Sequence, residues 1–330
     1  MFKWVAPNVV ECHALAYAGA SAWLRLKPVN GILIIDKLAG FTSHDVVARV
    51  RRILKIKRVG HTGTLDPFAT GVMVVLVGKA TRLAQFLDKD EKEYEADVHF
   101  GFETDTGDRT GTRRGDGETR GRGDVLTMFN VEQALGHFRG EIMQTPPMYS
   151  AKKIDGKKLY EHARKGETIE RKPSKVCIHS LELLESAIRN PQSSIDIIRI
   201  RVSCSAGTYI RALAEDIGRQ IGVGAHLAEL RRTRAGRFDL SLSVTLEELE
   251  KMEDPMTALI KMEEAVEHLL SVTLDADRVE KTKSGLSTRL AEAQFTDGQP
   301  IRMLDESENL IAVGFYEETE NSIRPKVVLV

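Results

Sequence analysis

The chain has 330 residues, 42% of them hydrophobic and 29% charged, with 26 glycines and 10 prolines; this composition excludes a disordered, collagen-like or proline-rich protein and leaves room for two packed units. The cysteines Cys12, Cys177 and Cys204 are too few and too far apart for a disulfide framework or a zinc knuckle, and they favour a reducing cytoplasm. The formal net charge of −1 hides an asymmetry, because residues 245–330 hold 9 Lys+Arg against 19 Asp+Glu, whereas the rest of the chain holds 38 against 29. The larger, basic part suits a polyanionic ligand, although charge alone leaves a merely solvated surface as an alternative.

Residues 1–28 precede the first predicted strand. The alanine-rich run from Ala14 to Ala22 is similar to the apolar part of a signal peptide, but Glu11 and His13 stand just before it and no clean cleavage pattern follows. We therefore expect a poorly ordered extension or a misassigned start. No later segment reaches the roughly eighteen consecutive apolar residues of a membrane span.

Order is expected to begin at Gly31, because GILIIDK is a short apolar run bounded by glycine, as in a buried strand. Ser43 can then cap a helix. The apolar positions that share one face of this helix are Val46, Val50, Ile53 and Leu54. Its other side and its exit carry six positive residues, which we call the basic cluster: Arg49, Arg51, Arg52, Lys55, Lys57 and Arg58. Because like charges repel one another, phosphate contact is favoured over a solvated face.

The next segments predict strands and short helices. Residues 72–78 (VMVVLVG) are typical of a second buried strand, and residues 80–87 of a short helix. From Tyr94 to Phe100 the sequence alternates strictly between apolar and polar residues, which predicts a strand with one buried face. Residues 107–124 combine glycine and charge without an apolar period, so we expect a mobile loop or one that orders on a ligand.

Beyond this loop a helix is expected over residues 131–138, and a turn at Asp155-Gly156 leads into a lysine-rich amphipathic helix. Residues 195–204 alternate as a strand, after which Thr208 can cap a further helix. The predicted buried face of that helix holds Ile210, Leu213, Ala214 and Ile217. Because strands and helices follow without a regular βαβ repeat, we expect an α+β fold, with flanking helices on a mixed, largely antiparallel sheet.

The acidic C-terminal part shows short strands and glycine turns from Leu274 onward. It is long enough for a small β-rich module, and its boundary is expected between Glu250 and Leu274. We therefore divide the chain into an extension (1–28), a larger domain (29–250) and a C-terminal domain (251–330).

One carboxylate stands out as a candidate for chemistry. The sequence has no HExxH pair, no GxxxxGK phosphate loop and no GxSxG elbow, which argues against metal- and ATP-driven reactions. Residues 60–71, GHTGTLDPFATG, place Asp66 among three glycines and a proline. Pro67 restricts the backbone of Asp66, and the glycines allow another backbone to approach closely. A carboxylate held in this way can act as a nucleophile or base, while an Asx turn before the proline is the structural alternative.

Five ordered motifs carry a resemblance to a known family. They are DKLAGFTS, GHTGTLDPFATGV, GFETDTGDRTG, CSAGTYIRALAEDIG and GAHLAELRRT. In this order they resemble the motifs of the TruB family of tRNA pseudouridine synthases, over the chain from about Asn30 to the C-terminus. The resemblance implies an isomerase that converts uridine 55 in the T-loop of tRNA to pseudouridine, with no cofactor and no metal. It also implies that the C-terminal domain is a PUA-like RNA-binding domain.

The resemblance implies roles for individual residues. Asp66 matches the catalytic aspartate and nucleophile, and Arg211 matches the arginine that pairs with it. Tyr94 matches an active-site tyrosine that lies against the target base and is a candidate for proton transfer at C5. Leu230 matches an apolar residue that lines the uracil pocket, and Tyr209 is expected to support Arg211.

RNA contacts are expected from the following residues: His61, Lys37, Arg49, Arg52, Lys55 and Arg58. His61 resembles the residue that fills the space left in the T-loop when the base turns out, with a satisfied core histidine as the structural alternative. Lys37 lies in the first motif, where Leu38 stands in place of the proline usual in the family. Because leucine frees the backbone that proline would hold, we expect less local rigidity around Lys37.

The expected protein is a cytoplasmic monomer whose partner is tRNA, with neither a membrane nor a protein partner implied. Asp66 could attack C6 of uracil, attack C1′ of the ribose or abstract a ribose proton, and the sequence leaves these three steps open. Two rival functions also stay open: an RNA-guided or ribosomal-RNA pseudouridine synthase, and a non-catalytic chaperone that refolds tRNA through the same contacts.

Overall fold

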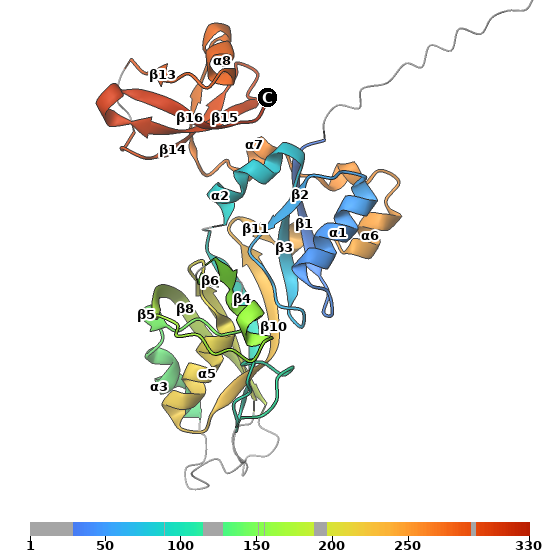
Figure 1. The fold of residues 1–330 in the computed structure, drawn as a ribbon, viewed down its shortest axis with the longest axis vertical. Helices are drawn as coiled ribbons and strands as arrows, with labels where there is room; N and C mark the ends of the chain where they lie inside the picture. Colours follow the sequence, from blue (N-terminus) through green and yellow to red (C-terminus); the bar gives the residue numbers. More distant parts are fainter. Residues whose placement is uncertain are drawn as a thin grey trace, which may run out of the picture.

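The structure, a computed structural model, describes residues 29–88, 90–114, 128–150, 152–154, 156–187, 197–291 and 295–330. The extension expected over residues 1–28 lies outside the described residues, and so does the expected mobile loop from residue 115 onward. Figure 1 shows an elongated molecule with the C-terminal strands at one end and helices α3 (Met128–Gly136) and α5 (Ile210–Ile221) near the other. None of the described helices is both long and apolar enough to cross a membrane.

Nine of the described strands form one sheet through the larger part of the molecule. Its path is β1 (Gly31–Lys37), β3 (Thr70–Val77), β10 (Ala225–Ala235), β4 (Lys92–Phe100), β9 (Ile197–Cys204), β8 (Ser174–Ala187) and β5 (Gly140–Gln144), with β2 (Val59–Thr62) beside β3 and β11 (Phe238–Asp239) beside β10. Neighbouring strands are antiparallel except β10 and β3, which are parallel. The chain is thus a mixed α and β protein with a mixed, largely antiparallel sheet, as expected.

The burial of the strands follows their sequence patterns. β1 and β3 are apolar throughout because both of their faces are covered: Leu33 packs with residues of helix α1 (Ser43–Leu54), whereas Ile34 packs with apolar residues of the C-terminal sheet. β4 alternates between buried and half-buried residues over its whole length, which confirms the predicted strand and extends it back to Lys92.

Two predicted helix caps are wrong. Helix α1 is capped by Thr42, whose hydroxyl accepts the N–H of Asp45, while the Asp45 carboxylate accepts the N–H of Thr42. Ser43 is instead buried, and its hydroxyl is bonded to the backbone N–H and carbonyl of Leu65 at 2.9 and 3.1 Å. This serine therefore ties the start of α1 to the segment that carries the candidate carboxylate.

Helix α5 begins without a side-chain cap at Tyr209, because the hydroxyl of Thr208 donates instead to the carbonyl of Ser205 at 2.9 Å. The predicted buried face is confirmed, with Ile210, Leu213, Ala214 and Ile217 all buried. The helix packs against β10, which passes through the middle of the main sheet.

Three other helices differ from expectation. The segment 80–87 forms a 3₁₀ turn, η1 (Gly78–Leu83), followed by the short helix α2 (Ala84–Leu87), because the Thr81 hydroxyl binds the carbonyl of Gly78 and tightens the first turn. The helix expected over 131–138 ends at Gly136. The lysine-rich segment forms the hairpin β6 (Lys153–Ile154) and β7 (Lys157–Lys158) before a short helix α4 (Leu159–Ala163).

A second sheet forms the C-terminal end. Its strand order is β12 (Leu270–Thr273), β14 (Pro300–Leu304), β15 (Leu310–Glu317), β16 (Ser322–Val328) and β13 (Thr288–Arg289), accompanied by helix α8 (Ala276–Lys283). Residues Leu310, Val313 and Val327 pack with apolar side chains of β1, β3 and α2.

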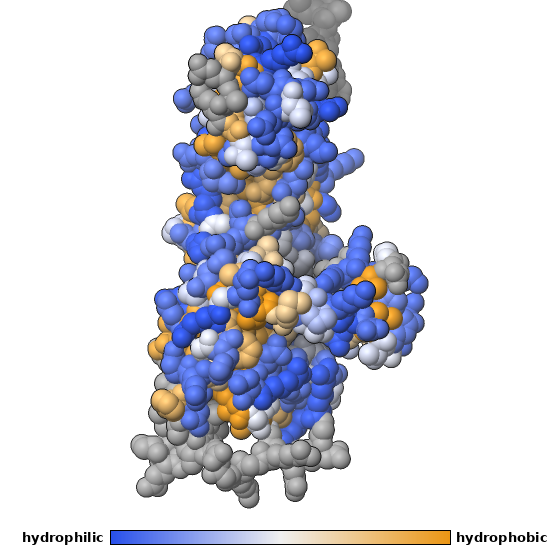
Figure 2. Space-filling view, turned by 90° about the vertical axis from the view of Figure 1, so that its left-hand side faces the viewer, coloured by the Kyte–Doolittle hydropathy of each residue, from blue (hydrophilic) through white to orange (hydrophobic). Residues whose placement is uncertain are grey.

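The face shown in Figure 2 is mostly hydrophilic, with hydrophobic residues in small separate areas.

The two sheets are joined by a segment that belongs structurally to the first. It contains α6 (Leu246–Lys251), η3 (Pro255–Ala258) and α7 (Met262–Ala265). Ile260 exchanges two backbone hydrogen bonds with Ile32 of β1, at 2.9 and 2.8 Å. The second sheet thus begins at Leu270, beyond Glu250 and within the interval expected for the boundary.

Candidate active site

The candidate carboxylate lies on a short connection between β2 and β3, which we call the Asp66 loop (residues 63–69). Gly71, directly after it, has φ +99°, and a Cβ at this position would lie 2.2 Å from the backbone oxygen of Arg232. A larger residue would therefore push the loop away from β10. The Ser43 hydroxyl and the Lys37 ammonium, which donates to the carbonyl of Pro67 at 3.3 Å, hold the loop from the other side.

Asp66 and Arg211 meet as the motifs implied. Arg211 Nε lies 2.8 Å from Asp66 Oδ2, and Arg211 Nη2 donates to Asp66 Oδ1 at 3.3 Å, so both carboxylate oxygens are held. The arginine side chain is only 5% exposed, whereas that of Asp66 is 32% exposed. The guanidinium thus anchors the carboxylate from inside, and a part of the carboxylate stays open to a ligand.

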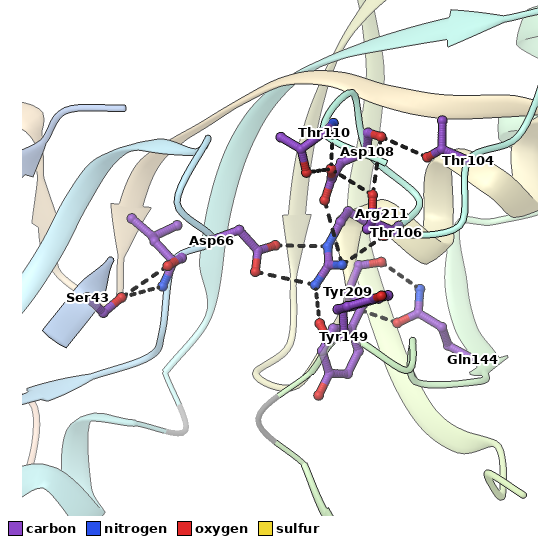
Figure 3. A network of polar contacts seen from close by, with 11 residues as sticks. Ser43, Asp66, Thr104, Thr106, Asp108, Thr110, Gln144, Tyr149, Tyr209 and Arg211 are labelled. Atoms are coloured by element: carbon purple, nitrogen blue, oxygen red, sulfur yellow. Dashed lines mark hydrogen bonds and ion pairs between the residues drawn. The ribbon is translucent and has the colours of Figure 1, made fainter. Parts of the chain in front are cut away.

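Arg211 is itself fixed by the surrounding backbone (Figure 3). Nη1 donates to the carbonyl of Thr106 at 2.8 Å, and Nη2 donates to the carbonyl of Tyr149 at 2.7 Å. The buried carboxylate of Asp108 lies 3.7 Å from Nη1. Since the planar fork of the guanidinium is used on several sides, Arg211 has one defined orientation toward Asp66.

Asp108 is the functional candidate that the sequence reasoning missed. It falls in the segment expected to be a mobile loop, but the structure buries it, with Thr106 and Thr110 hydroxyls donating to its Oδ1 at 2.9 and 2.5 Å. The backbone around it is bound to β10 through hydrogen bonds of Arg109 and Gly107 with Leu227. Three threonines and two aspartates within GFETDTGDRTG were the available signal.

Opposing effects act on the Asp66 carboxyl. Burial raises its pKa above the ordinary value, and the nearby Asp108 carboxylate adds to that rise. The Arg211 guanidinium and the Lys37 ammonium favour the ionised form and work against it. The pair with Arg211 is therefore what allows a partly buried carboxylate to carry charge.

A pocket of about 230 Å³ opens next to Asp66. Among its lining residues are Asp66, Tyr94, Tyr209, Arg211 and Leu230, so the structure brings all five predicted active-site residues together. The ring of Tyr94 and the side chain of Leu230 are buried, and they come from the neighbouring strands β4 and β10.

Tyr209 is held at this pocket through its backbone. Its N–H donates to Gln144 Oε1 at 2.8 Å, and its carbonyl accepts from Gln144 Nε2 at 3.0 Å. Gln144, which the sequence reasoning did not single out, is 1% exposed and lies at the end of β5. This two-bond clamp sets where helix α5 starts and hence where Arg211 projects.

A second hollow of about 380 Å³ shares Asp66 and Arg211 with the first. Phe68, Tyr149 and Tyr160 are among the residues that line it. The pair of Asp66 and Arg211 therefore lines both cavities.

Lys37 does not lie on the surface, as an RNA contact would require. Its side chain is fully buried, and the ammonium donates to the carbonyls of Leu38, Phe41 and Pro67. Burial lowers the pKa of Lys37 to about 8. Leu38 itself is 44% exposed, and the turn keeps its shape without the usual proline because three backbone carbonyls share the lysine.

His61 lies on β2 and is partly buried beside His44, with ring centroids 6.1 Å apart. Its Nδ1 is buried without a hydrogen-bond partner among the described residues. Burial, with the charges of His44 and Arg232, lowers the pKa of His61 to about 4. The imidazole is therefore neutral at physiological pH.

Two members of the basic cluster bind other side chains, although every member except Arg49 is exposed. Arg49 forms an ion pair with Glu250 of α6, and Arg58 Nε donates to the Thr81 hydroxyl at 2.6 Å. Arg52 and Lys55 are exposed. The acidic segment that follows Thr245 thus neutralises part of the surface that the sequence assigned to phosphates.

Comparison with protein families agrees with this site. Residues 51–210 match the N-terminal domain of the TruB family of pseudouridylate synthases, and residues 211–271 match the tRNA pseudouridylate synthase B C-terminal domain. A tRNA pseudouridine synthase B of Geobacillus thermodenitrificans is 42% identical over 85% of this chain and 93% of its own length. That of Bacillus anthracis is 39% identical over 92% of this chain and 98% of its own length.

Solved structures are similar as well. A Cbf5-Nop10-Gar1 complex contains a chain that is 30% identical, with a TM-score of 0.69 over 91% of this chain and 85% of its own length. An H/ACA RNP bound to a substrate RNA containing 2′-deoxyuridine contains one that is 27% identical, with a TM-score of 0.68 over 91% and 85%. Since the family models span most of the chain and the relatives share its motifs and length, this chain belongs to the TruB family of pseudouridylate synthases.

Proposed function

We propose that the protein converts uridine 55 in the T-loop of tRNA to pseudouridine, with Asp66 as the catalytic nucleophile. One observation carries the proposal: a carboxylate held on both oxygens by a buried arginine stands at the mouth of a pocket of about 230 Å³ that is lined by an aromatic ring and a leucine. The relatives named tRNA pseudouridine synthase B support the choice of substrate.

The reaction needs no net redox change and no hydrolysis. The N1–C1′ bond breaks, the uracil turns within the pocket, and a C5–C1′ bond forms, while the proton on C5 is lost and N1 gains one. Attack at C6, attack at C1′ and abstraction of a ribose proton all require Asp66 to be ionised and aimed into the pocket. The geometry of Arg211 serves each of these steps, because it favours the carboxylate and fixes its direction.

Tyr94 and Leu230 would hold the uracil ring between them while it turns. Burial raises the pKa of the Tyr94 phenol, so it is protonated at physiological pH and can donate a hydrogen bond or relay the C5 proton. Tyr209, clamped by Gln144, would complete the wall beside Arg211.

The target base must leave the T-loop before it reaches this pocket, at a cost of roughly a few kcal/mol. Phosphate contacts can offset that cost. We assign them to the exposed Arg52 and Lys55 rather than to Arg49 and Arg58, which bind other side chains. A neutral His61 suits insertion between bases, because it brings no charge into the stack.

The C-terminal sheet completes the proposed RNA-binding protein as a small PUA-like domain. Its net negative charge argues that it recognises RNA through shape and local contacts rather than through a broad positive surface. We propose further that the protein acts as a monomer in the cytoplasm, where its tRNA substrate is found and where free thiols such as Cys177 and Cys204 persist.

A stand-alone reaction separates this function from that of an RNA-guided enzyme. The purified chain is incubated with an unmodified tRNA transcript, and pseudouridine is mapped by carbodiimide treatment and primer extension. We expect complete conversion at position 55 without any guide RNA. Absence of product until a guide RNA or partner protein is added would favour the RNA-guided alternative.

Asp66→Asn separates catalysis from a chaperone role. Cells that lack the enzyme are complemented with either the parent chain or this variant, and pseudouridine 55 and aminoacylation of tRNA are measured. We expect the variant to restore no pseudouridine. If tRNA folding is restored in full by the inactive variant, the chaperone role stands beside the enzymatic one.

A further inference from the structure

Arg232 is a buried arginine at the candidate active site that none of the steps above uses. It lies on β10, its side chain is 1% exposed, and it lines the same pocket as Asp66 and Tyr94. Among the described residues it forms no ion pair with a carboxylate, in contrast to Arg211. Burying a cation without an anionic partner costs free energy. The hydrogen bonds of Arg232 have to offset this cost.

The guanidinium of Arg232 binds the start of the Asp66 loop and the strand that follows the loop. Nε donates to the carbonyl of Val72 at 2.7 Å, and Nη2 donates to the carbonyl of Gly63 at 3.1 Å. Gly63 begins the loop that carries Asp66, and Val72 lies just beyond its end. One planar group therefore fixes the start of the loop relative to strand β3.

Arg232 also stands directly beside the Tyr94 phenol. The two residues are register partners on the antiparallel strands β10 and β4. Both side chains line the same pocket, and the charge of Arg232 works against the rise of the Tyr94 pKa that burial causes. The other groups that act on this phenol are Asp66 from the loop and Cys204 from β9, and the Lys92 ammonium lines the same pocket from β4.

We propose that Arg232 is a positioning residue for catalysis, which holds the Asp66 loop closed and orients and polarises the Tyr94 phenol without touching Asp66. The inference rests on the proposed function, because it assigns Arg232 to the same uridine pocket. The two arginines of that pocket then have different roles, since Arg211 directs the carboxylate, whereas Arg232 directs the loop and the phenol.

The kinetic test compares Arg232→Lys and Arg232→Met with the matched control Arg234→Lys. Arg234 lies on the same strand and also donates to a backbone carbonyl, that of Gly236 at 3.1 Å, but it lies outside the pocket. We expect kcat to fall by about a hundredfold or more in both Arg232 variants, because a small misplacement of reacting groups has this effect. The Kd for tRNA should stay within about threefold, and the control should keep its kcat.

A spectroscopic test does not depend on turnover. 3,5-Difluorotyrosine is placed at position 94 alone, so that the ring fluorines lower the phenol pKa into an accessible range and report its ionisation by ¹⁹F NMR. Arg232→Met should raise the midpoint by about one pH unit or more, since it removes a neighbouring cation. Hydrogen exchange of residues 63–69 should accelerate in the same variant and not in Arg234→Lys.

These readouts separate the failure of this inference from that of the proposed function. An unchanged ¹⁹F midpoint together with unchanged exchange in the Asp66 loop would overturn the role of Arg232, whatever the activity. If the parent chain made no pseudouridine while both readouts moved as expected, the proposed function would be wrong. The role of Arg232 in holding the Asp66 loop and orienting the phenol would be supported. Should Arg232→Met fail to fold, Arg232→Lys carries the kinetic and hydrogen-exchange comparisons, because lysine can reach only one of the two carbonyls. Arg232→Gln, which also removes the cation, then carries the ¹⁹F comparison.

Discussion

Arg211 and Asp66 form a two-point contact in which each carboxylate oxygen faces a different guanidinium nitrogen, at 2.8 and 3.3 Å. The arginine comes from the first turn of α5 and the aspartate from the loop between β2 and β3, 145 positions apart in the chain. Because the arginine is buried and bound to two backbone carbonyls, it sets the position of the aspartate rather than following it.

Replacement of Asp66 by asparagine should abolish turnover and preserve binding. The amide keeps the shape of the side chain but removes the nucleophile and the charge, so we expect kcat to fall by at least about a thousandfold. Pseudouridine formation and tRNA affinity are measured on the same preparations. The control is Asp97→Asn, farther along β4, where the aspartate pairs with the exposed Arg199; this variant should keep full activity. Residual turnover of Asp66→Asn within tenfold of the parent would contradict the assignment.

Replacement of Arg211 by lysine should reduce kcat by about a hundredfold or more, because a single ammonium cannot reproduce a fork that contacts Asp66, Thr106 and Tyr149 at once. Circular dichroism and melting temperature show whether the fold is retained. Arg201→Lys, at an exposed pair with Glu95, makes the same chemical change elsewhere in the sheet. Near-normal activity of Arg211→Lys would mean that another group holds Asp66 in place.

The pH profile should show an acid limb that belongs to Asp66. Since burial raises the pKa of this carboxyl, single-turnover rates should fall as pH decreases through a midpoint above the ordinary value of about 4. The Asp108 carboxylate contributes to the rise, so Asp108→Asn should move the midpoint to lower pH. A midpoint that stays unchanged in this variant would show that Asp108 does not act on Asp66 electrostatically.

His61 should reduce the acid stability of the protein. Its pKa is about 4 in the folded state and about 6.5 in an unfolded chain, so between these pH values the unfolded chain binds more protons and stability falls as pH falls. His61→Gln should therefore lose less melting temperature than the parent between pH 7 and pH 4.5. His179→Gln, at an exposed histidine, is the control. Equal losses of melting temperature in the parent and both variants would show that protonation of His61 does not cause the loss of stability.

Salt dependence should distinguish the members of the basic cluster. The double variant Arg52→Ala/Lys55→Ala, which removes the two exposed residues assigned to phosphates, should lower the slope of log Kd against log salt by about two, one per phosphate contact. Arg49→Ala should leave the slope nearly unchanged, because Arg49 is paired with Glu250. The reverse pattern, with Arg49 carrying the slope, would show that the ion pair opens when tRNA binds.

Local patterns along the chain predicted the secondary structure around the site. The apolar run of β1 and the strict alternation of β4 predicted their strands, because side-chain burial alternates with a period that neighbouring residues display. The glycines and the proline around Asp66 marked a constrained loop for a similar reason: their backbone preferences are local. The ordered motifs then identified the residues that line the pocket.

Which of these residues interact became evident from the folded chain. Asp108 was predicted to lie in a charged, mobile loop, but it is buried and contacts Thr106, Thr110 and Arg211. Lys37 read as a surface cation, yet backbone carbonyls of two separate turns enclose it. Such contacts join segments that are far apart along the chain and depend on how the strands cross, which no local pattern of charge or hydrophobicity encodes.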